Sequence, residues 1–405
     1  MKTRNLGPNG PAVSAVGLGC MSMSPVYGQK EDRGEAIATL HRAIELGITL
    51  VDTADSYGPH HNEELLGDAL TGRRDRVFLA TKFGVVRGSG EPTINGSPAY
   101  ARSAVEASLR RLRTDYIDLY YLHRVDPTVP IEDSVGALAD LIKQGKVRYI
   151  GLSEVAPATL ERGHRTHSIT AVESEYSLWT RDPEKELISV CERIGTAFVP
   201  FSPLGRGFLT GEIRSPDDFD PGDRRRHYPR FQGANFEANL RLADKVKELA
   251  TKKGVTPSQL ALAWVLAKGP HVVPIPGTRR RKYLEDNAAV VDVALSQTEM
   301  AEIDATFPPD IVSGERYPAS MLKATNGCLS RLANGTVKSR TAASTDAARE
   351  ALRESLAPEC VRDEIDEDTR FGRQERAARV VDRDRSFVDV PVRQKAHERA
   401  ALQMR

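Results

Sequence analysis

The chain has few cysteines and no long hydrophobic run. Its 405 residues include only four cysteines, and none of their spacings matches a metal site or a redox-active pair. This scarcity favours free thiols in a reducing cytoplasm. No apolar stretch approaches the ~20 residues that cross a bilayer, and residues 1–7 lack the apolar core of a secretory signal. We therefore predict a cytoplasmic protein with no membrane partner.

A strong charge of one sign is also missing. Lysine and arginine number 57 against 56 aspartate and glutamate residues, which gives a formal net charge of +1. Such a balance creates no overall field that attracts nucleic acid or an anionic lipid surface. The hydrophobic fraction of 40% is typical of a globular domain. We therefore expect a small-molecule ligand and no nucleic acid partner.

Short apolar segments alternate with amphipathic helical patterns over most of the chain. Apolar residues three or four apart, such as Val105, Leu109 and Leu112, predict the helices. The near-continuous apolar segments between helices predict strands that are buried on both faces. Eight such strands alternating with helices favour an α/β fold of the (β/α)8 (TIM) barrel type. The predicted strands cover residues 16–21, 48–52, 77–82, 116–123, 147–153, 169–176, 197–202 and 272–275.

Three segments fall outside this alternation. A hairpin over residues 2–15 precedes the first strand, and we expect it to close the barrel bottom. An insertion over 205–234, rich in Asp, Arg, Pro and Gly, interrupts the pattern. Over residues 328–405 charged residues dominate without an apolar period, which predicts a disordered or weakly helical C-terminal tail. The predicted domains are therefore a barrel over 1–327 and a charged tail over 328–405.

Three predicted strands end in polar residues that share the inward-facing parity. Asp52, Lys82 and His123 continue the alternation of their strands toward the barrel interior. Tyr57 lies in the loop that follows Asp52. Taken singly, these residues have plain structural explanations, such as an Asp52–Lys82 ion pair or a core histidine. Their agreement in phase across three strands favours an active site at the carboxyl ends of the strands.

The chemistry of these residues is coherent with carbonyl reduction. Tyrosine has a pKa near 10 in water, and an ammonium at Lys82 favours the phenolate and lowers that pKa. Asp52 keeps the ammonium charged, and His123 donates a hydrogen bond that orients a substrate carbonyl. Tyr57 can then protonate the oxygen as negative charge develops on it. The set predicts reduction of an aldehyde or ketone by hydride.

Asp52, Tyr57, Lys82 and His123, in this order at these strand ends, resemble the catalytic tetrad of the aldo-keto reductase family. Several motifs around them agree with this resemblance over roughly residues 1–327. They are DTADSYG (52–58), NEELLG (62–67), ATKFG (80–84), DLYYLH (118–123), KQGKVRYIGLS (143–153), SPLGRG (202–207) and PIPGT (274–278).

The resemblance implies a (β/α)8 barrel that binds NADP(H) without a Rossmann domain and reduces an aldehyde or ketone to the alcohol. Tyr57 is then the general acid, Lys82 tunes it, Asp52 pairs with Lys82, and His123 orients the carbonyl. No metal is expected. The implied cofactor contacts are Ser153, Glu173, Phe201, Ser202, Pro203, Leu204, Gly205, Arg206, Thr278, Arg279, Arg280, Lys282, Asp286 and Asn287.

Two of these implied contacts differ from the family pattern. Glu173 stands where the family usually has glutamine, and an ionised carboxylate only accepts hydrogen bonds from the nicotinamide amide. Phe201 replaces a common tyrosine but keeps the stacking face. The segment 202–206 matches the pyrophosphate-binding loop. The cationic segment 278–282 matches the site of the adenosine 2′-phosphate and favours NADPH over NADH.

The loops of the predicted barrel give fewer indications of function than the strand ends. Residues 224–231 of the insertion either fold over the pyrophosphate or form a basic surface loop. An apolar substrate pocket lined by Val26, Tyr27, Phe83, Trp179 and Tyr317 is expected, although Trp179 also suits a core position.

Alternatives to a reductase remain open from the sequence. A Schiff-base lyase would use Lys82 as a neutral amine, which the nearby Asp52 disfavours. A barrel loaded with cofactor can also act as a redox-sensing subunit. A metal site at His123 with His60 or His61 is a weaker alternative, because the histidine pair falls in a polar loop.

Overall fold

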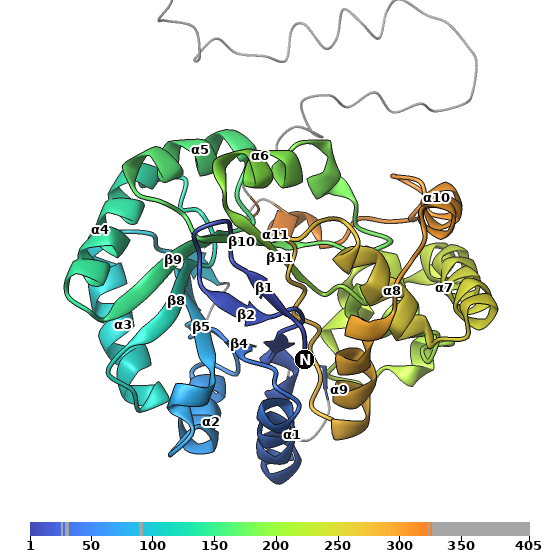
Figure 1. The fold of residues 1–405 in the computed structure, drawn as a ribbon, viewed down its shortest axis with the longest axis horizontal. Coiled ribbons are helices and arrows are strands. Elements are labelled where there is room, and N and C mark those ends of the chain that lie inside the picture. The colour runs from blue at the N-terminus through green and yellow to red at the C-terminus, as the bar shows by residue number, and fades with distance from the viewer. Residues whose placement is uncertain (26, 29–31, 89–91, 323–324, 326–405) are drawn as a thin grey trace, which may run out of the picture. The chain divides into compact units, whose positions relative to one another are not determined.

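The core of the structure is a parallel sheet with the strand order β11-β10-β9-β8-β5-β4-β3 (Figure 1). The computed structural model describes residues 1–25, 27–28, 32–88, 92–322 and 325. In register, Asp52 pairs with Ala80 and Lys82 with Tyr121. The strands are β3 (Leu18–Gly19), β4 (Leu50–Asp52), β5 (Phe78–Phe83), β8 (Ile117–Leu122), β9 (Val147–Ser153), β10 (Ala171–Glu175) and β11 (Ala197–Phe201).

Residues 272–277 take the eighth place and close the barrel. Isolated parallel bridges join them to β11 on one side and to β3 on the other. The regular strand predicted here does not form, because Pro274 and Pro276 have no N–H to donate to a ladder. Their carbonyls still accept hydrogen bonds from Gly17 and Gly19. The predicted (β/α)8 fold is confirmed, with a closing segment held by fewer bonds than expected.

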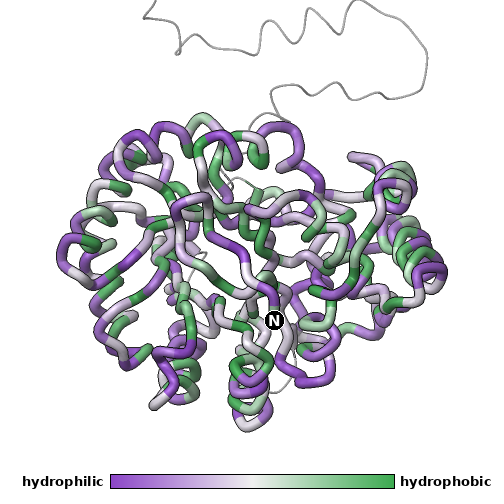
Figure 2. The backbone as a smooth tube through the Cα atoms, in the orientation of Figure 1, coloured by the Kyte–Doolittle hydropathy of each residue, from purple (hydrophilic) through white to green (hydrophobic). Residues whose placement is uncertain are grey.

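Helices surround the sheet, as the apolar spacing predicts. Val135, Leu138 and Leu141 are buried along one face of α4, and hydrophobic segments run along the strands (Figure 2). The helices are α1 (Arg33–Glu45), α2 (His61–Ala69), α3 (Pro98–Leu112), α4 (Ile131–Lys143), α5 (Pro157–Thr166), α6 (Leu187–Ile194), α7 (Gly233–Lys253), α8 (Pro257–Leu266), α9 (Arg281–Ala288), α10 (Gln297–Thr306) and α11 (Ala319–Leu322).

The N-terminal hairpin closes the bottom of the barrel, as predicted. Its strands β1 (Thr3–Asn5) and β2 (Ala12–Ser14) pair antiparallel. Leu6 and Val13 belong to the buried cluster that fills the barrel interior. Arg4 ties the hairpin to the chain after α8 through a 2.8 Å bond to the Gly269 carbonyl oxygen.

Two connections carry more structure than the sequence indicates. The loop after β5 contains a short antiparallel pair, β6 (Val85–Val86) and β7 (Thr93–Ile94). The insertion after β11 folds into short 3-10 turns around a cluster of aromatic rings, including Phe208, Phe219 and Phe231. These rings make the insertion a packed part of the barrel.

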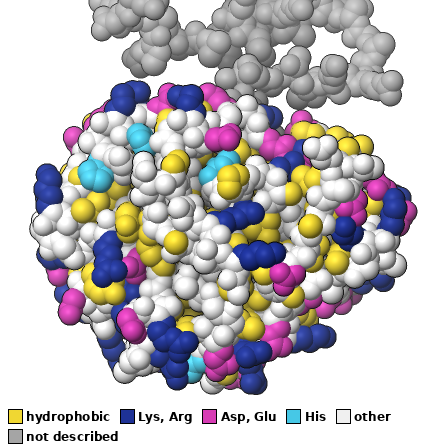
Figure 3. All heavy atoms as spheres, in the orientation of Figure 1, with side chains coloured by type: hydrophobic (Ala, Val, Ile, Leu, Met, Phe, Trp, Pro, Cys, Tyr) yellow, Lys and Arg dark blue, Asp and Glu magenta, His cyan; other side chains and the backbone are white. Residues whose placement is uncertain are grey.

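The surface agrees with the balanced composition. Acidic and basic side chains are interspersed over the face that carries the hairpin (Figure 3). Within the described ranges, no helix is long and apolar enough to cross a membrane. The predicted tail over 328–405 lies outside the described residues, so the tail and the domain boundary stay predictions.

Candidate active site

Four polar side chains meet at the carboxyl ends of β4, β5 and β8. Asp52 is the last residue of β4, Lys82 lies near the end of β5, and His123 directly follows β8. Parallel pairing sets these strand ends side by side, and Tyr57 reaches them from the loop after β4. The Tyr57 and His123 rings pack edge to face with centroids 5.8 Å apart. The structure thus brings together all four residues that the sequence selects.

Lys82 is the centre of this group and is fully buried. Its ammonium donates to the Asp52 carboxylate and, over 2.9 Å, to the Thr53 carbonyl oxygen. The Tyr57 hydroxyl lies 3.4 Å from the same nitrogen. Burial lowers the pKa of Lys82, but the carboxyl groups of Asp52 and Glu173 outweigh burial and raise it above its usual range. Lys82 therefore stays charged, which disfavours the Schiff-base alternative.

Glu173 is a second carboxyl group on Lys82, a contact that the sequence does not reveal. It lies on β10, and its Oε2 is 3.2 Å from the Lys82 ammonium. Burial and the neighbouring Asp52 raise the pKa of Glu173 to about 8, against the opposing effect of Lys82. At neutral pH Glu173 therefore holds a proton and can donate as well as accept. This corrects the accept-only carboxylate expected from the sequence.

We expect the stability of the wild type to fall as pH rises from 5 to 9. In Glu173→Gln this fall should be smaller. A carboxyl group whose pKa is raised by folding binds its proton more tightly in the native state, so stability falls between its unfolded pKa and about 8. Melting temperatures across this range should converge at low pH and favour the glutamine variant by at least ~2–4 °C at pH 9. Parallel curves for the two proteins would contradict the raised pKa. Glu302→Gln, on exposed α10, is the matched control.

The pKa of Tyr57 is raised, because burial outweighs the ammonium of Lys82, which acts in the opposite direction. Lys82 lowers the pKa of Tyr57, as we expected, but the net shift of this pKa is upward. The carboxyl groups of Asp52 and Glu173 add to the rise. Tyr57 is therefore a phenol at neutral pH and holds a proton that it can donate.

His123 is a neutral imidazole. Burial, followed by the charges of Arg124 and Lys82, lowers its pKa well below the usual range. The Ser56 hydroxyl lies 3.3 Å from Nδ1, and acceptance of this bond by Nδ1 puts the ring proton on Nε2. Within the described part of the chain, no group of three or more His, Cys, Asp or Glu side chains is placed to hold a metal.

A cavity of about 1550 Å³ opens over these residues. Asp52, Tyr57 and His123 line it, and the buried Lys82 is not part of its wall. All but one of the cofactor contacts that the sequence implies also line this cavity. They are Ser153, Glu173, Phe201, Ser202, Pro203, Leu204, Arg206, Thr278, Arg279, Arg280, Lys282, Asp286 and Asn287.

Two residues of the loop after β11 have other contacts than those the resemblance implies. Gly205 is not in the cavity wall; it packs so closely on Trp179 that an added Cβ would lie 2.7 Å from the indole ring. Arg206 lines the cavity, but its guanidinium donates to Glu175 over 2.7 Å and lies against two tyrosine rings. Arg206 is therefore already held by a carboxylate.

The residues predicted for an apolar pocket divide into two groups. Tyr27 and Tyr317 line the cavity. Phe83 and Trp179 are buried in the core instead, where Trp179 stacks on an aromatic ring of the insertion. Val26 lies outside the described residues.

The insertion forms part of the cavity wall. Arg224, Arg225 and Tyr228 line the cavity, and Arg225 is held by Asp223 and by the Arg206 carbonyl oxygen. This arrangement excludes the alternative in which residues 224–231 form only a basic surface loop.

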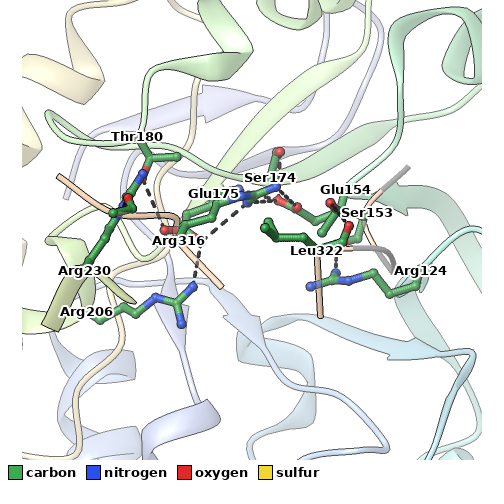
Figure 4. A network of polar contacts seen from close by, with 12 residues as sticks. Arg124, Ser153, Glu154, Ser174, Glu175, Thr180, Arg206, Arg230, Arg316 and Leu322 are labelled. Atoms are coloured by element: carbon green, nitrogen blue, oxygen red, sulfur yellow. Dashed lines mark hydrogen bonds and ion pairs between the residues drawn. The ribbon is translucent and has the colours of Figure 1, made fainter. Parts of the chain in front are cut away.

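A buried ion network adjoins the cavity (Figure 4). Arg316, from the segment after α10, donates to both oxygens of Glu154 over 3.0 and 2.5 Å, and lies 3.5 Å from Glu175. Burial alone would raise the pKa of Glu154, but Arg316 and Arg124 outweigh it and lower the pKa to about 2. The network fixes the segment after α10 over the barrel, and Arg316 has no signal in the sequence because its partners lie far from it along the chain.

A buried acid–ammonium–phenol group thus lies beside a neutral histidine at the carboxyl ends of the barrel strands. Residues 15–307 match the model of the Aldo/keto reductase family. The chain therefore belongs to the aldo/keto reductase family.

Solved structures agree with this family. The glycerol dehydrogenase AKR11B4 from Gluconobacter oxydans is 30% identical and matches 76% of this chain and 96% of its own, with a TM-score of 0.68. The aldo-keto reductase AKR11C1 from Bacillus halodurans is 29% identical over 76% of this chain and 96% of its own, with a TM-score of 0.63. An aldo/keto reductase from Klebsiella pneumoniae, solved with NADP and acetate, is 28% identical over 78% and 99%, with a TM-score of 0.61.

Proposed function

We propose that this protein is an NADPH-dependent reductase that converts an aldehyde or a ketone reversibly into the alcohol. The observation that carries the proposal is the Tyr57 hydroxyl, held as a phenol 3.4 Å from the Lys82 ammonium on the wall of a large cavity. This arrangement supplies both a proton and the charge that stabilises the phenolate left behind.

Each residue of the group has one task in this proposal. Tyr57 gives its proton to the substrate oxygen as negative charge develops on that oxygen. Lys82 stabilises the resulting phenolate, and Asp52 keeps Lys82 charged. His123 donates from Nε2 to the carbonyl oxygen and orients it for reaction.

The residues of the cavity fit NADP(H), which supplies the hydride when it is bound. One buried oxygen of its wall, Ser22 Oγ, lacks a hydrogen-bond partner within the described residues and suits a polar ligand. Phe201 offers an aromatic face for the nicotinamide. The 2′-phosphate would be held by the cationic residues at the start of α9, where the helix terminus also favours an anion.

A survey of carbonyl substrates tests the proposal. Purified protein is mixed with NADPH and a panel of short and aromatic aldehydes and ketones, and NADPH oxidation is followed by absorbance. We expect turnover of at least part of the panel and formation of the matching alcohol by chromatography. NADPH binding without turnover of any carbonyl would overturn the reductase and favour the cofactor-sensing alternative.

Arg279→Ala is expected to weaken NADPH binding about 10- to 100-fold and NADH binding much less. A hydrogen bond to a charged group contributes ~1.5–3 kcal/mol, and only NADPH carries the 2′-phosphate. Dissociation constants are measured by fluorescence titration. Arg281→Ala is the control, because Arg281 pairs with Glu35 over 3.1 Å and does not line the large cavity. Equal losses for both cofactors would refute the assignment of the 2′-phosphate.

A further inference from the structure

Three arginines from separate segments line the cavity near the proposed proton donor. Arg87 comes from the loop after β5, Arg124 directly follows His123, and Arg224 comes from the insertion. Arg87 donates to the carbonyl oxygen of Ser56, the neighbour of Tyr57, over 2.9 Å. This places one of the three cations beside the reacting group.

The second arginine, Arg124, lies beside His123 and Ser153. Arg124 donates to the His123 carbonyl oxygen over 2.7 Å and to Ser153 Oγ over 3.3 Å (Figure 4). Its charge lowers the pKa of His123, as does that of Arg87. The two guanidinium groups therefore act on the histidine that would orient the carbonyl.

These three arginines make no ion pair with a carboxylate among the residues that the structure describes. Three other arginines at or beside the cavity are each paired with a carboxylate. Arg206 is held by Glu175, Arg225 by Asp223 and Arg316 by Glu154, although Arg225 and Arg224 are adjacent in the chain. Arg87, Arg124 and Arg224 therefore differ from these three paired arginines of the same region.

The nearby acids are already committed or neutral. Asp52 and Glu173 face Lys82, and Glu154 is held through both oxygens by Arg316. Asp55 also influences the pKa of Arg87, but burial and then Glu63 raise the pKa of Asp55 to about 8, so Asp55 holds a proton at neutral pH. Among the residues with described positions, positive charge therefore exceeds negative charge at this part of the cavity.

Such an arrangement is unfavourable without an anion. The pKa of Arg87 is lowered by burial and then by the like charge of Arg224, so the two guanidinium groups act on each other. An anionic ligand would relieve this repulsion through charge-assisted, fork-shaped hydrogen bonds. The cationic residues proposed for the 2′-phosphate belong to a different segment, which leads into α9, a helix that packs on α1 and α8.

We infer that the substrate is an anionic carbonyl compound, an aldehyde or ketone with a carboxylate or phosphate group that Arg87, Arg124 and Arg224 bind. The inference rests on the proposed reductase function and narrows its substrate class. Apolar side chains that also line the cavity, such as Val85, Ile94 and Met321, suit a short carbon chain between the carbonyl and the anion. The anion would hold the substrate so that its carbonyl meets Tyr57 and His123.

Matched pairs of substrates test the inference. The full chain is assayed with NADPH on 4-oxobutanoate against its methyl ester, and on glyceraldehyde 3-phosphate against glyceraldehyde. We expect kcat/KM for the charged member of at least one pair to exceed that of the neutral member about 10-fold or more. The pair with the larger ratio distinguishes carboxylate from phosphate. Equal or better reduction of both neutral members overturns the inference.

Substitution of Arg87 tests whether the preference for charged substrates comes from the three arginines. Arg87→Gln should reduce the charged-to-neutral ratio about 10-fold or more, and Arg87→Lys should restore most of it. If Arg87→Gln does not fold, Arg224→Gln serves as the second cavity variant. Arg241→Gln is the control, because it removes the same charge from an exposed position on α7. An unchanged ratio in both cavity variants, or an equal change in the Arg241 variant, contradicts the assignment.

A binding measurement separates this inference from the proposed function. Succinate and inorganic phosphate are titrated into the full chain by calorimetry, with 1,4-butanediol as the neutral probe. Binding of either anion that Arg87→Gln weakens supports the anion site even if no carbonyl is reduced, in which case only the reductase proposal fails. Turnover of neutral carbonyls without binding of either anion overturns the anion site and leaves the reductase proposal intact.

Discussion

We expect Tyr57→Phe to lower kcat/KM for carbonyl reduction by about 10²- to 10⁴-fold, the range typical of a lost general acid. The substitution removes only the hydroxyl that lies 3.4 Å from the Lys82 ammonium and keeps the ring that packs against His123. NADPH binding should therefore persist. The loss is measured as NADPH oxidation at saturating cofactor, with fluorescence titration to confirm that the cofactor still binds.

Tyr149→Phe is the control for this experiment. Tyr149 lies on β9, is half-buried against Phe78, and does not line the cavity. Its variant should keep wild-type turnover. Unchanged turnover in the Tyr57 variant would refute Tyr57 as the proton donor, because the variant has no hydroxyl at that position beside Lys82.

We expect Arg316→Met to lower the free energy of unfolding by about 3–5 kcal/mol, because it leaves Glu154 buried without its cation. Glu154 is only 4% exposed, and Arg316 donates to both of its oxygens. The fall is measured by urea unfolding at neutral pH. The double variant Arg316→Met/Glu154→Gln should recover most of the loss, since it removes the unpaired charge together with the cation.

The loss should also depend on pH. The pKa of Glu154 is lowered to about 2, so the stabilisation from its pair with Arg316 is present above the usual carboxyl pKa and disappears as pH falls toward 2. The gap between wild type and Arg316→Met should therefore shrink in acid. Arg214→Met, which breaks an exposed pair with Asp244, should cost less than about 1 kcal/mol. A similar small cost for Arg316→Met would show that the buried pair contributes little.

The meeting of the four residues of the proposed catalytic group could be predicted because its signal is local. Asp52, Lys82 and His123 each end an apolar strand, and the two-residue alternation of a strand fixes which side chains point inward. Parallel strands then place those ends on one rim. Glu173 carried a similar signal, since it shares parity with Ala171, which lies in the inner cluster. Its contact with Lys82 nevertheless depends on curvature that brings β10 across the barrel toward β5.

Contacts from loops could not be predicted. Arg316 reaches Glu154 from a segment 162 positions away, and no spacing rule links two such residues. Gly205 and Arg206 matched a motif, but their side of the loop was decided by packing against Trp179 and by the pair with Glu175. The position of the motif therefore predicted that this loop borders the cavity, but not which way each of its residues faces.

The sequence by itself determined the barrel, the closing hairpin and the four residues at the strand ends, because periodicity and strand parity act over a few residues. Only the tertiary structure decided their protonation states. Burial raised the pKa of Tyr57 where an isolated pair with Lys82 predicts a lower one, and it left Glu173 protonated at neutral pH. Burial and long-range charge are sums over neighbours that the folded chain alone brings together.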